Sequence, residues 1–460
     1  MSKMVAAITA HNFIQFMVSQ GRRVVSSHGD IFVFNGKVFD LLDGDQFAKV
    51  VSDFVLRSMG VNYTYATNIR EIVETVKQRV AVDSAWRPHF IGNKDKPAPV
   101  HVVGNGILTF DDTGNFTVGP HTDDLLATEK TKYNYDPKVK TCRKFHDFLK
   151  WFCEQDQSLY DLNLELMAAP LLRNFLDIQM FPVFAGPSGA NGKSVRLNAQ
   201  SLLYGIGNVS ALTMESVGKP FALPMMEHKT LNVDTDINTS SKVAESQLKK
   251  LVDGSLLKYE RKYQDPVTGR NWASLAFSCN LLPRVIAQDG GIQRRFLFIP
   301  CESRITGNRI SNLESTFDFS GVLAMVLAVM PRLMANGELS IPPKVSDFNR
   351  EVWQENNSVH LFLSEYVRLS AKSRQPKAEL YQNYSNFCNR NGFKAYASST
   401  FGRHVAAYFA AAVRSGDVLK RARTLDTREP AYIGIEFCPS GVHQELSIEA
   451  LTEEIVEGKV

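Results

Sequence analysis

The chain has 460 residues, of which 44% are hydrophobic and 22% charged, as is ordinary for a globular protein of roughly two to four domains. Its net charge of +4 permits a polyanionic partner without arguing for one. No apolar run approaches the roughly 18 residues that span a bilayer, and the N-terminus is too polar for a secretory signal. We therefore expect a cytoplasmic protein without membrane contact. Six widely spaced cysteines, with no histidine at zinc-ligand spacing, predict reduced and mostly buried thiols rather than disulfides or structural zinc.

The first 125 residues predict a mixture of short helices and β-hairpins. Apolar residues recur at helical spacing over residues 5–17. Asn35-Gly36 separates two β-rich runs, which predicts a hairpin because both residues tolerate a positive φ. Residues 107–118 predict a second hairpin, and residues 93–99 predict a loop.

The pattern then changes twice along the chain. Strands alternate with helices over residues 126–340, which is typical of an α/β domain. Over residues 345–440 three amphipathic helices precede two strand-like runs, around 417–424 and 431–437, an order that fits a winged helix. Residues 441–460 are acidic and predict a disordered tail. The apolar positions of the first two helices are Val359, Phe362, Leu363, Tyr366 and Val367, then Leu380, Tyr384, Phe387 and Cys388.

The strongest single feature is a glycine-rich turn between an apolar strand, residues 180–185, and a helix. A nucleotide-binding phosphate loop requires this order, because its backbone N–H groups face the phosphates and the helix N-terminus adds partial positive charge. Lys193 would reach the β- and γ-phosphates, and the Ser194 hydroxyl would bind Mg²⁺. Pro187 stands where the strict spacing has glycine, so a simple surface turn is the competing interpretation. The residues expected to bind nucleotide are Gly189, Ala190, Asn191, Gly192, Lys193 and Ser194.

Polar residues end the next two predicted strands. Asp234 and Asp236 lie two positions apart on an extended segment and therefore point to the same side. Hydrolysis of a nucleotide needs an acid near the Mg²⁺ and another that orients the attacking water, although aspartates at strand ends are also common turn formers. Asn280 ends a third strand, where its amide would either bond the γ-phosphate and water or merely cap the strand.

Two arginines, Arg294 and Arg295, precede a fourth apolar strand. Such a pair is either solvated or contains an arginine finger, which stabilises charge on the phosphates of a neighbouring subunit's nucleotide. The candidate catalytic residues are Lys193, Asp234, Asp236, Asn280, Arg294 and Arg295.

The order of these motifs resembles the superfamily 3 helicases, which are ATPases of the AAA+ type. The resemblance is greatest to the phage, plasmid and poxvirus primase-helicase branch, whose Gly-x-Asn-Gly-Lys-Ser loop is similar to residues 189–194. Residues 105–108, 120–124 and 133–137 resemble the segment before that ATPase, so the resemblance covers most of residues 30–410. The resemblance implies a Walker A loop that binds ATP through Lys193 and Mg²⁺ through Ser194. It implies that Asp234 and Asp236 are the Walker B acids and that Asp234 also binds the metal. It further implies that Asn280 is sensor 1 and that Arg294 or Arg295 is the arginine finger.

Residues 251–263 resemble the papillomavirus helicase segment in which Asp-Gly precedes the tip of a DNA-gripping hairpin. The match implies that Arg261, Lys262 and Tyr263 line a central channel, where cations contact phosphate and an aromatic ring packs on sugar or base. A solvated charged loop is the alternative. Arg403 lies on the third helix of the expected winged helix and would serve either duplex binding or a structural or docking role.

We therefore expect an α/β protein with an N-terminal α+β region (1–125), a superfamily 3 AAA+ helicase domain (126–340) and a winged helix (345–440). The expected function is ATP-dependent DNA unwinding for viral, phage or mobile-element replication in the host cytoplasm. The resemblance implies ATP and Mg²⁺ as cofactors. It also implies a homo-oligomeric ring, expected to be a hexamer, that binds single-stranded or forked DNA and has a separate primase or polymerase as partner. Two alternatives stay open: a primase-helicase, disfavoured because we find no convincing acidic triad before the phosphate loop, and an ATP-switched origin-binding initiator without processive unwinding.

Overall fold

The computed structural model describes residues 1–27, 29–82, 90–91, 98–173, 176–186, 190–227, 229–237, 243–262, 265–282, 290–306, 310–355, 357–391, 393, 395–410, 421–423 and 430–439. The chain divides into two compact units. The first comprises residues 1–283 and 294–345, and the second comprises residues 284–293 and 346–460. Each unit has a hydrophobic core of its own.

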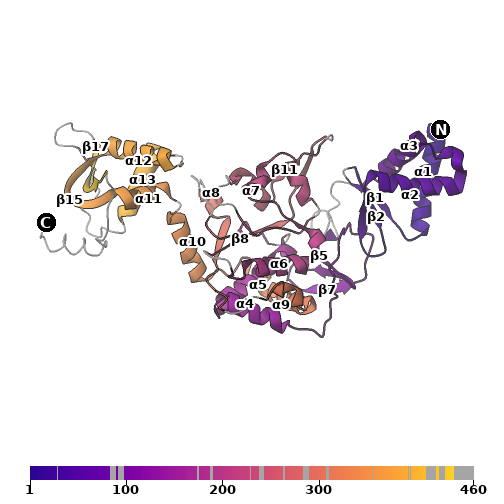
Figure 1. The fold of residues 1–460 in the computed structure, drawn as a ribbon, viewed down its shortest axis with the longest axis horizontal. Helices are drawn as coiled ribbons and strands as arrows, with labels where there is room; N and C mark the ends of the chain where they lie inside the picture. The colour runs from indigo at the N-terminus through magenta and orange to yellow at the C-terminus, as the bar shows by residue number, and fades with distance from the viewer. Residues whose placement is uncertain are drawn as a thin grey trace. The chain divides into compact units, whose positions relative to one another are not determined.

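The first unit begins with three helices that pack against a three-stranded antiparallel sheet (Figure 1). The hairpin predicted at Asn35-Gly36 is confirmed, because Phe34 pairs with Phe39 across the turn. A capping box starts the second helix, since the Asp43 side chain accepts from the Gln46 backbone N–H at 2.7 Å and Gln46 accepts from the Asp43 N–H at 3.1 Å. The elements are α1 (Lys3–Ser19), β1 (Val24–Ser27), β2 (Asp30–Phe34), β3 (Phe39–Leu42), α2 (Gly44–Met59), η1 (Val61–Tyr63) and α3 (Ala66–Arg79).

A second antiparallel sheet follows, with strands β4 (Phe90–Ile91), β5 (Ala98–Val103), β6 (Gly106–Phe110) and β7 (Phe116–Gly119). The β6–β7 pair confirms the second predicted hairpin. The loop predicted over residues 93–99 is wrong at its end, because residues 98 and 99 belong to β5, and residues 93–97 lie outside the described part. Val103, Leu108 and Phe110 join the largest core of the unit, so the chain before residue 125 contributes to the core of the domain that follows.

A five-stranded parallel sheet forms the centre of the first unit. Its strands lie in the order β14-β8-β13-β10-β9, which is 5-1-4-3-2 when the five are numbered along the chain. Every residue of β8 is buried, as is expected for a parallel strand covered on both faces. Because all strands run the same way, their carboxyl ends meet at one edge. They are β8 (Phe181–Ala185), β9 (Val209–Ser210), β10 (Leu231–Asp234), β13 (Ser274–Cys279) and β14 (Phe296–Pro300).

Helices α4 (Arg143–Phe152), α5 (Gln157–Leu172), α6 (Lys193–Tyr204) and α9 (Phe319–Asn336) complete the largest core together with this sheet. Most residues of α5 are buried, and the helix packs against α9, as a core helix does. In Figure 1, α5 and α9 lie on one side of β8 and α7 (Glu245–Val252) lies on the other. Contrary to expectation, α9 is long and apolar enough to cross a membrane, but its buried residues, Val322 and Met330 among them, belong to this core.

In its described part, the second unit combines several helices with a three-stranded antiparallel sheet in the order β15-β17-β16. The three predicted helices and the run at 431–437 are confirmed, and part of the run at 417–424 forms β16. The apolar stripe that placed Val367 in a helix was wrong there, because Val367 begins β15, a strand that the sequence did not predict. Few bulky apolar residues follow Leu369, so no alternating pattern marks the strand. The elements are α8 (Gly290–Gln293), α11 (Ser358–Tyr366), β15 (Val367–Pro376), α12 (Lys377–Asn391), α13 (Ser398–Ala410), β16 (Arg421–Arg423) and β17 (Pro430–Phe437), and α10 (Pro343–Glu355) spans the division between the units.

Candidate functional site

The glycine-rich turn connects the carboxyl end of β8 to the first residue of α6. Gly186 has no room for a side chain, because a Cβ there would clash with the Cys301 carbonyl and the Asn191 amide. Gly192 caps α6 with a φ of 82°, and a Cβ there would also lie 2.9 Å from the Trp151 ring. Both positions therefore require glycine for local steric reasons. Three residues of the turn, 187–189, lie outside the described part, and with them the predicted Gly189 contact.

Lys193 is buried at the N-terminus of α6, with 5% of its surface exposed. Its ammonium donates to the carbonyl oxygen of Gly186 at 2.9 Å and to Oδ1 of Asn280 at 3.1 Å. Burial lowers the pKa of Lys193 below its ordinary value, and the Asp236 carboxylate is one of the groups that oppose this effect. The structure thus brings Asn280, 87 residues away in sequence, into contact with the phosphate-loop lysine.

The remaining residues of the predicted loop lie around this lysine. Ala190 adopts a positive φ of 69°, which is unusual for a residue with a side chain. Asn191 is buried and donates through Nδ2 to the Cys301 carbonyl at 3.4 Å, so it ties the loop to the end of β14. Ser194 is exposed in the first turn of α6.

The two acids follow β10, which lies beside β13 in the sheet. Asp234 is half-buried, and its Oδ1 accepts from the Asp236 backbone N–H at 3.3 Å. Its Oδ2 is buried and has no hydrogen-bond partner among the described residues. Burial raises the pKa of Asp234, the hydrogen bond from the Asp236 backbone lowers it, and the Asp236 charge raises it further. Asp236 itself is exposed. One carboxylate oxygen therefore lies at the carboxyl edge of the sheet without the donor or cation that a buried charge requires.

The two arginines differ in their surroundings. Arg295 has only 6% of its side chain exposed and forms a two-point ion pair with Asp253, with Nε 2.8 Å from Oδ1. Arg294 is exposed. Both precede β14, which pairs from Phe296 onward with the amino end of β8, so they lie at the sheet edge opposite the phosphate loop. The pairing separates two residues that the sequence could not tell apart: Arg294 is accessible and Arg295 is held within the chain.

The predicted hairpin is confirmed as two antiparallel strands, β11 (Leu256–Tyr259) and β12 (Val267–Arg270). Lys262 is exposed in the connecting turn, and Tyr263 lies outside the described part. Arg261 departs from the predicted role, because its guanidinium pairs with Asp30 at 2.9 Å and with Glu227 and is only 16% exposed. Burial alone would lower the pKa of Arg261, but the two carboxylates outweigh it and raise that pKa. In this conformation Arg261 is a buried link within the first unit and not an exposed channel residue.

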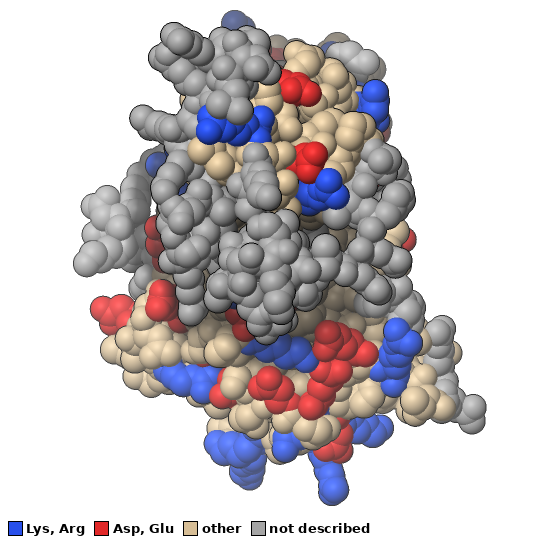
Figure 2. All heavy atoms as spheres, turned by 90° about the vertical axis from the view of Figure 1, so that its left-hand side faces the viewer, with Lys and Arg blue, Asp and Glu red and all other residues tan. Residues whose placement is uncertain are grey.

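The third helix of the second unit, α13, presents one of the predicted basic residues to solvent. Arg403 is exposed and donates to the Thr400 hydroxyl at 3.1 Å. His404 is half-buried, with its ring centroid 5.0 Å from that of Tyr396, and burial together with the charge of Arg403 lowers its pKa. On the face seen in Figure 2, basic and acidic side chains are interspersed over the described surface.

Two long-range contacts of the first unit were not found from the sequence. Asp253 was noted only as part of the Asp-Gly pair, although it holds Arg295. Arg173, at the end of α5, donates to the Leu251 carbonyl at 2.7 Å and also to the Ala273 carbonyl. No local pattern marks either contact, since the partners lie 42 and 78 or more residues away.

Two family models match parts of the chain. Residues 184–295 match a family of unknown function (DUF5906), and residues 354–427 match the family described as poxvirus D5 protein-like. Two solved apo structures of the NrS-1 C-terminal region, each 12% identical to this chain, cover 92% of it and 98% of their own length with a TM-score of 0.51. The resemblance to the phage and poxvirus primase-helicase type is confirmed. No curated protein sequence matches the chain.

The first family match lies in the first unit apart from residues 284–293, and the second match lies in the second unit. The first begins at Phe184, within β8, and ends at Arg295, so it spans the phosphate loop, both acids, the hairpin and Asn280. The second covers α11, α12 and α13 of the second unit. At 12% identity, the likeness to the NrS-1 structures concerns the fold of the chain.

Proposed function

We propose that this protein is an ATP-driven DNA helicase of viral or phage replication, built on an AAA+ core and working as a ring around single-stranded DNA. The observation that carries the proposal is that Lys193, Asn280 and the buried Asp234 Oδ2, which has no described partner, lie at the carboxyl edge of one parallel sheet. The strand order 5-1-4-3-2 supports the AAA+ assignment, because it places the Asn280 strand between the phosphate-loop strand and the acid strand. Ligands of open α/β sheets bind at this edge.

The residues at this edge fit ATP and Mg²⁺. The buried Oδ2 of Asp234 has no described partner and would gain one from a hydrated cation. Gly186 and Gly192 keep the loop free of side chains, so that backbone N–H groups and the α6 N-terminus stay open to an anion. The buried Lys193 ammonium donates hydrogen bonds to a carbonyl oxygen and an amide oxygen. A charged phosphate oxygen would be a stronger hydrogen-bond acceptor for it.

The chain's own residues then divide the work at this site. Bound ATP supplies the phosphoryl bond, and Mg²⁺ neutralises its charge. Lys193 is held by Gly186 and Asn280, so its ammonium is oriented before any ligand arrives. Asp234 would hold the metal with Ser194. Asp236 is exposed and beside it, and we assign it to the orientation of the attacking water, together with the Asn280 amide.

The ring is supported by the position of Arg294. It lies before the amino end of β14, and the phosphate loop follows the carboxyl end of β8, a full strand length away. Five residues at roughly 3.3 Å each put about 16 Å between these ends. Arg294 is therefore exposed at the end of the strands opposite its own phosphate loop, where it would be available to the nucleotide of a neighbouring subunit, as an arginine finger is. We assign the finger to Arg294 and not to Arg295, because Arg295 is paired with Asp253.

DNA contact is assigned to Lys262 at the tip of the β11–β12 hairpin. Lys262 is exposed in the turn between two paired strands, so a phosphate can reach its ammonium. Arg261 would assist only after leaving Asp30 and Glu227. In the second unit, the element order α11-β15-α12-α13-β16-β17 with β17 central supports a winged helix, with α13 in the recognition position.

The test measures ATP hydrolysis and strand displacement on a forked DNA for three lysine variants. Lys193→Ala should lose both activities by about two orders of magnitude, because it removes the charge that faces the phosphates. Lys262→Ala should keep hydrolysis and lose displacement. Lys258→Ala is the matched control: it removes an exposed lysine from the stem of the same hairpin, where it pairs with Glu260, and should behave as wild type.

Other results of these assays would contradict specific parts of the proposal. Hydrolysis that survives Lys193→Ala would contradict the phosphate-loop assignment. Equal displacement by Lys262→Ala and Lys258→Ala would remove the hairpin from DNA translocation. A wild-type protein that hydrolyses ATP but displaces no strand would favour the ATP-switched initiator over the helicase. Electron micrographs with ATP and single-stranded DNA test the ring separately, since monomeric particles would refute it.

A further inference from the structure

We propose that Asp253 is a positioning residue that couples the DNA hairpin β11–β12 to the arginine finger Arg294 through its ion pair with Arg295. The proposal rests on the proposed helicase function and assigns a role that neither the motifs nor the family resemblance supplies. A ring motor needs a link of this kind, because DNA contact at the tip must alter the site at a subunit interface. The Asp253–Arg295 pair lies between these two places.

Asp253 is placed at the root of the hairpin. It caps the C-terminus of α7, its backbone N–H bonds the Lys249 carbonyl at 3.0 Å, and Gly254 follows with a φ of 62°. β11 begins three residues after Asp253, at Leu256. With so little chain between them, a displacement of the hairpin moves Asp253 as well.

Arg295 is placed beside the finger and fixed to the sheet. It follows Arg294 directly, and its backbone carbonyl accepts from the Phe181 N–H at 2.8 Å, which ties it to the phosphate-loop strand β8. Its guanidinium binds both oxygens of Asp253, through Nε at 2.8 Å and through Nη2. A planar two-point pair fixes orientation as well as distance, which a single-point contact does not. Any rotation of the hairpin root is therefore passed to the backbone next to Arg294.

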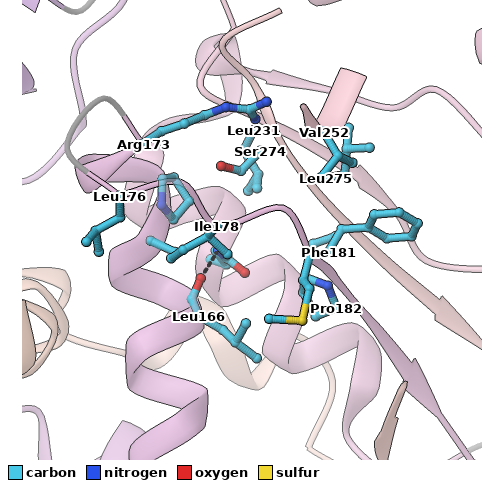
Figure 3. A pocket seen from close by; sticks show the side chains of 15 residues that line it. Leu166, Arg173, Leu176, Ile178, Phe181, Pro182, Leu231, Val252, Ser274 and Leu275 are labelled. Carbon is cyan, nitrogen blue, oxygen red and sulfur yellow. Dashed lines mark hydrogen bonds between the residues drawn. The ribbon is translucent and has the colours of Figure 1, made fainter. Parts of the chain in front are cut away.

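Packing alone does not hold this end of α7. A cavity of about 40 Å³ lies beside it, lined by apolar side chains that include Val252, Leu231 and Leu275 (Figure 3). Atoms that border a void lack packing partners on that side, so polar links add to the packing of the buried Leu248 and Leu251 in positioning the α7 end. Figure 3 shows Arg173 extended along the cavity, and its guanidinium donates to the Leu251 carbonyl at 2.7 Å. The hydrogen bond of Arg173 links the start of the hairpin to α5. The ion pair of Asp253 with Arg295 links it to the start of β14, next to Arg294.

The two side chains are also buried enough for the pair to matter. Arg295 is 6% exposed and Asp253 is 24% exposed. Removing one partner from such a pair leaves the other charge poorly solvated, so the pair persists while both are present. Exposed pairs of the chain, such as Arg350 with Asp347, exchange freely with water and could not transmit a displacement.

The experiment compares the stimulation of ATP hydrolysis by single-stranded DNA in wild type and Asp253→Asn, together with the KM for ATP and the melting temperature. Asparagine keeps the size of the side chain and removes its charge. We expect the stimulation ratio to fall at least about fivefold while the KM for ATP stays unchanged, because the nucleotide loop is not altered. Asp253→Glu, which restores the carboxylate, should recover part of the stimulation.

The matched control is Asp161→Asn. Asp161 is 29% exposed and pairs with Arg332 at 3.0 Å in the same unit, on α5 and away from the hairpin root. It should keep the wild-type stimulation ratio. If Asp253→Asn is insoluble, Arg295→Lys carries the same test, since lysine keeps the charge but cannot form the two-point pair.

Two results would overturn the coupling. One is an Asp253→Asn protein with wild-type stimulation. The other is a protein whose basal and stimulated rates fall together with its melting temperature, which is what a purely structural pair predicts. Failure of the proposed function looks different, because the wild type itself would then show no Lys193-dependent hydrolysis or no response to DNA.

Discussion

Replacing Asp234 with asparagine should make the nucleotide-free protein more stable while it abolishes ATP hydrolysis. The wild-type side chain keeps one oxygen buried without a described hydrogen-bond partner, and burial raises its pKa. A buried polar atom without a partner costs about 1–3 kcal/mol. Asparagine removes the charge and leaves the volume unchanged, so we expect a gain of about 1 kcal/mol in the free energy of unfolding of the first unit.

The gain in the free energy of unfolding from Asp234→Asn should increase with pH. The pKa of Asp234 is higher in the folded chain than the value of about 3.9 in an unfolded one. The stability that the wild-type group contributes is therefore fully present below about pH 3.9 and is lost as the pH rises through the folded pKa. The difference between the variant and wild type should be largest at pH 7 and should shrink as the pH falls toward 4.

Urea unfolding of both proteins between pH 4.5 and pH 7, without nucleotide, measures this difference. Asp236→Asn is the matched control, because Asp236 is exposed and its substitution should leave stability unchanged. Adding ATP and Mg²⁺ should stabilise the wild type more than Asp234→Asn. A variant that is less stable than wild type at pH 7, or a difference that does not vary with pH, would refute the desolvation argument.

Three further substitutions test parts of the fold. Gly186→Ala should abolish nucleotide binding and lower the free energy of unfolding by about 1–3 kcal/mol, because the added Cβ clashes with the Cys301 carbonyl. Fluorescence of a labelled nucleotide measures the binding, and unchanged binding would contradict this expectation. Glu165→Ala should cost about 3–5 kcal/mol in urea unfolding, since this fully buried carboxylate accepts from both N and Oγ of Ser340; a cost under 1 kcal/mol would mean that the network is dispensable. Tyr384→Phe should lower the stability of the second unit by about 1–2 kcal/mol through loss of its bond to Ser358, without changing ATP hydrolysis; a change in hydrolysis would show that the unit acts on the ATPase.

Local signals account for what could be predicted of the fold. The hairpin at Asn35-Gly36 and the strand-turn-helix around Lys193 formed where the sequence placed them, because each depends on residues within one short segment. β15 was missed because local signals for a strand are weak there. Its partner strand β17 lies 68 residues away in sequence, and its own residues show little alternation of apolar and polar side chains. Val367 reads equally well as the end of a helix stripe or the start of a strand, and only the partner strand decides.

The sequence by itself determined the chemistry available to this protein: a glycine turn that must stay open, a lysine at the start of a helix, and acids and an amide at strand ends. These follow from steric and periodic rules that act over a few residues. Only the tertiary structure decided which charges are free to act. Arg261 meets Asp30 across 231 residues and Arg295 meets Asp253 across 42, so both are neutralised within the chain, and Lys262 and Arg294 are left exposed beside them. Ion pairs form between groups that the folded backbone brings together, and the order of strands in the sheet, not their order in sequence, sets those distances.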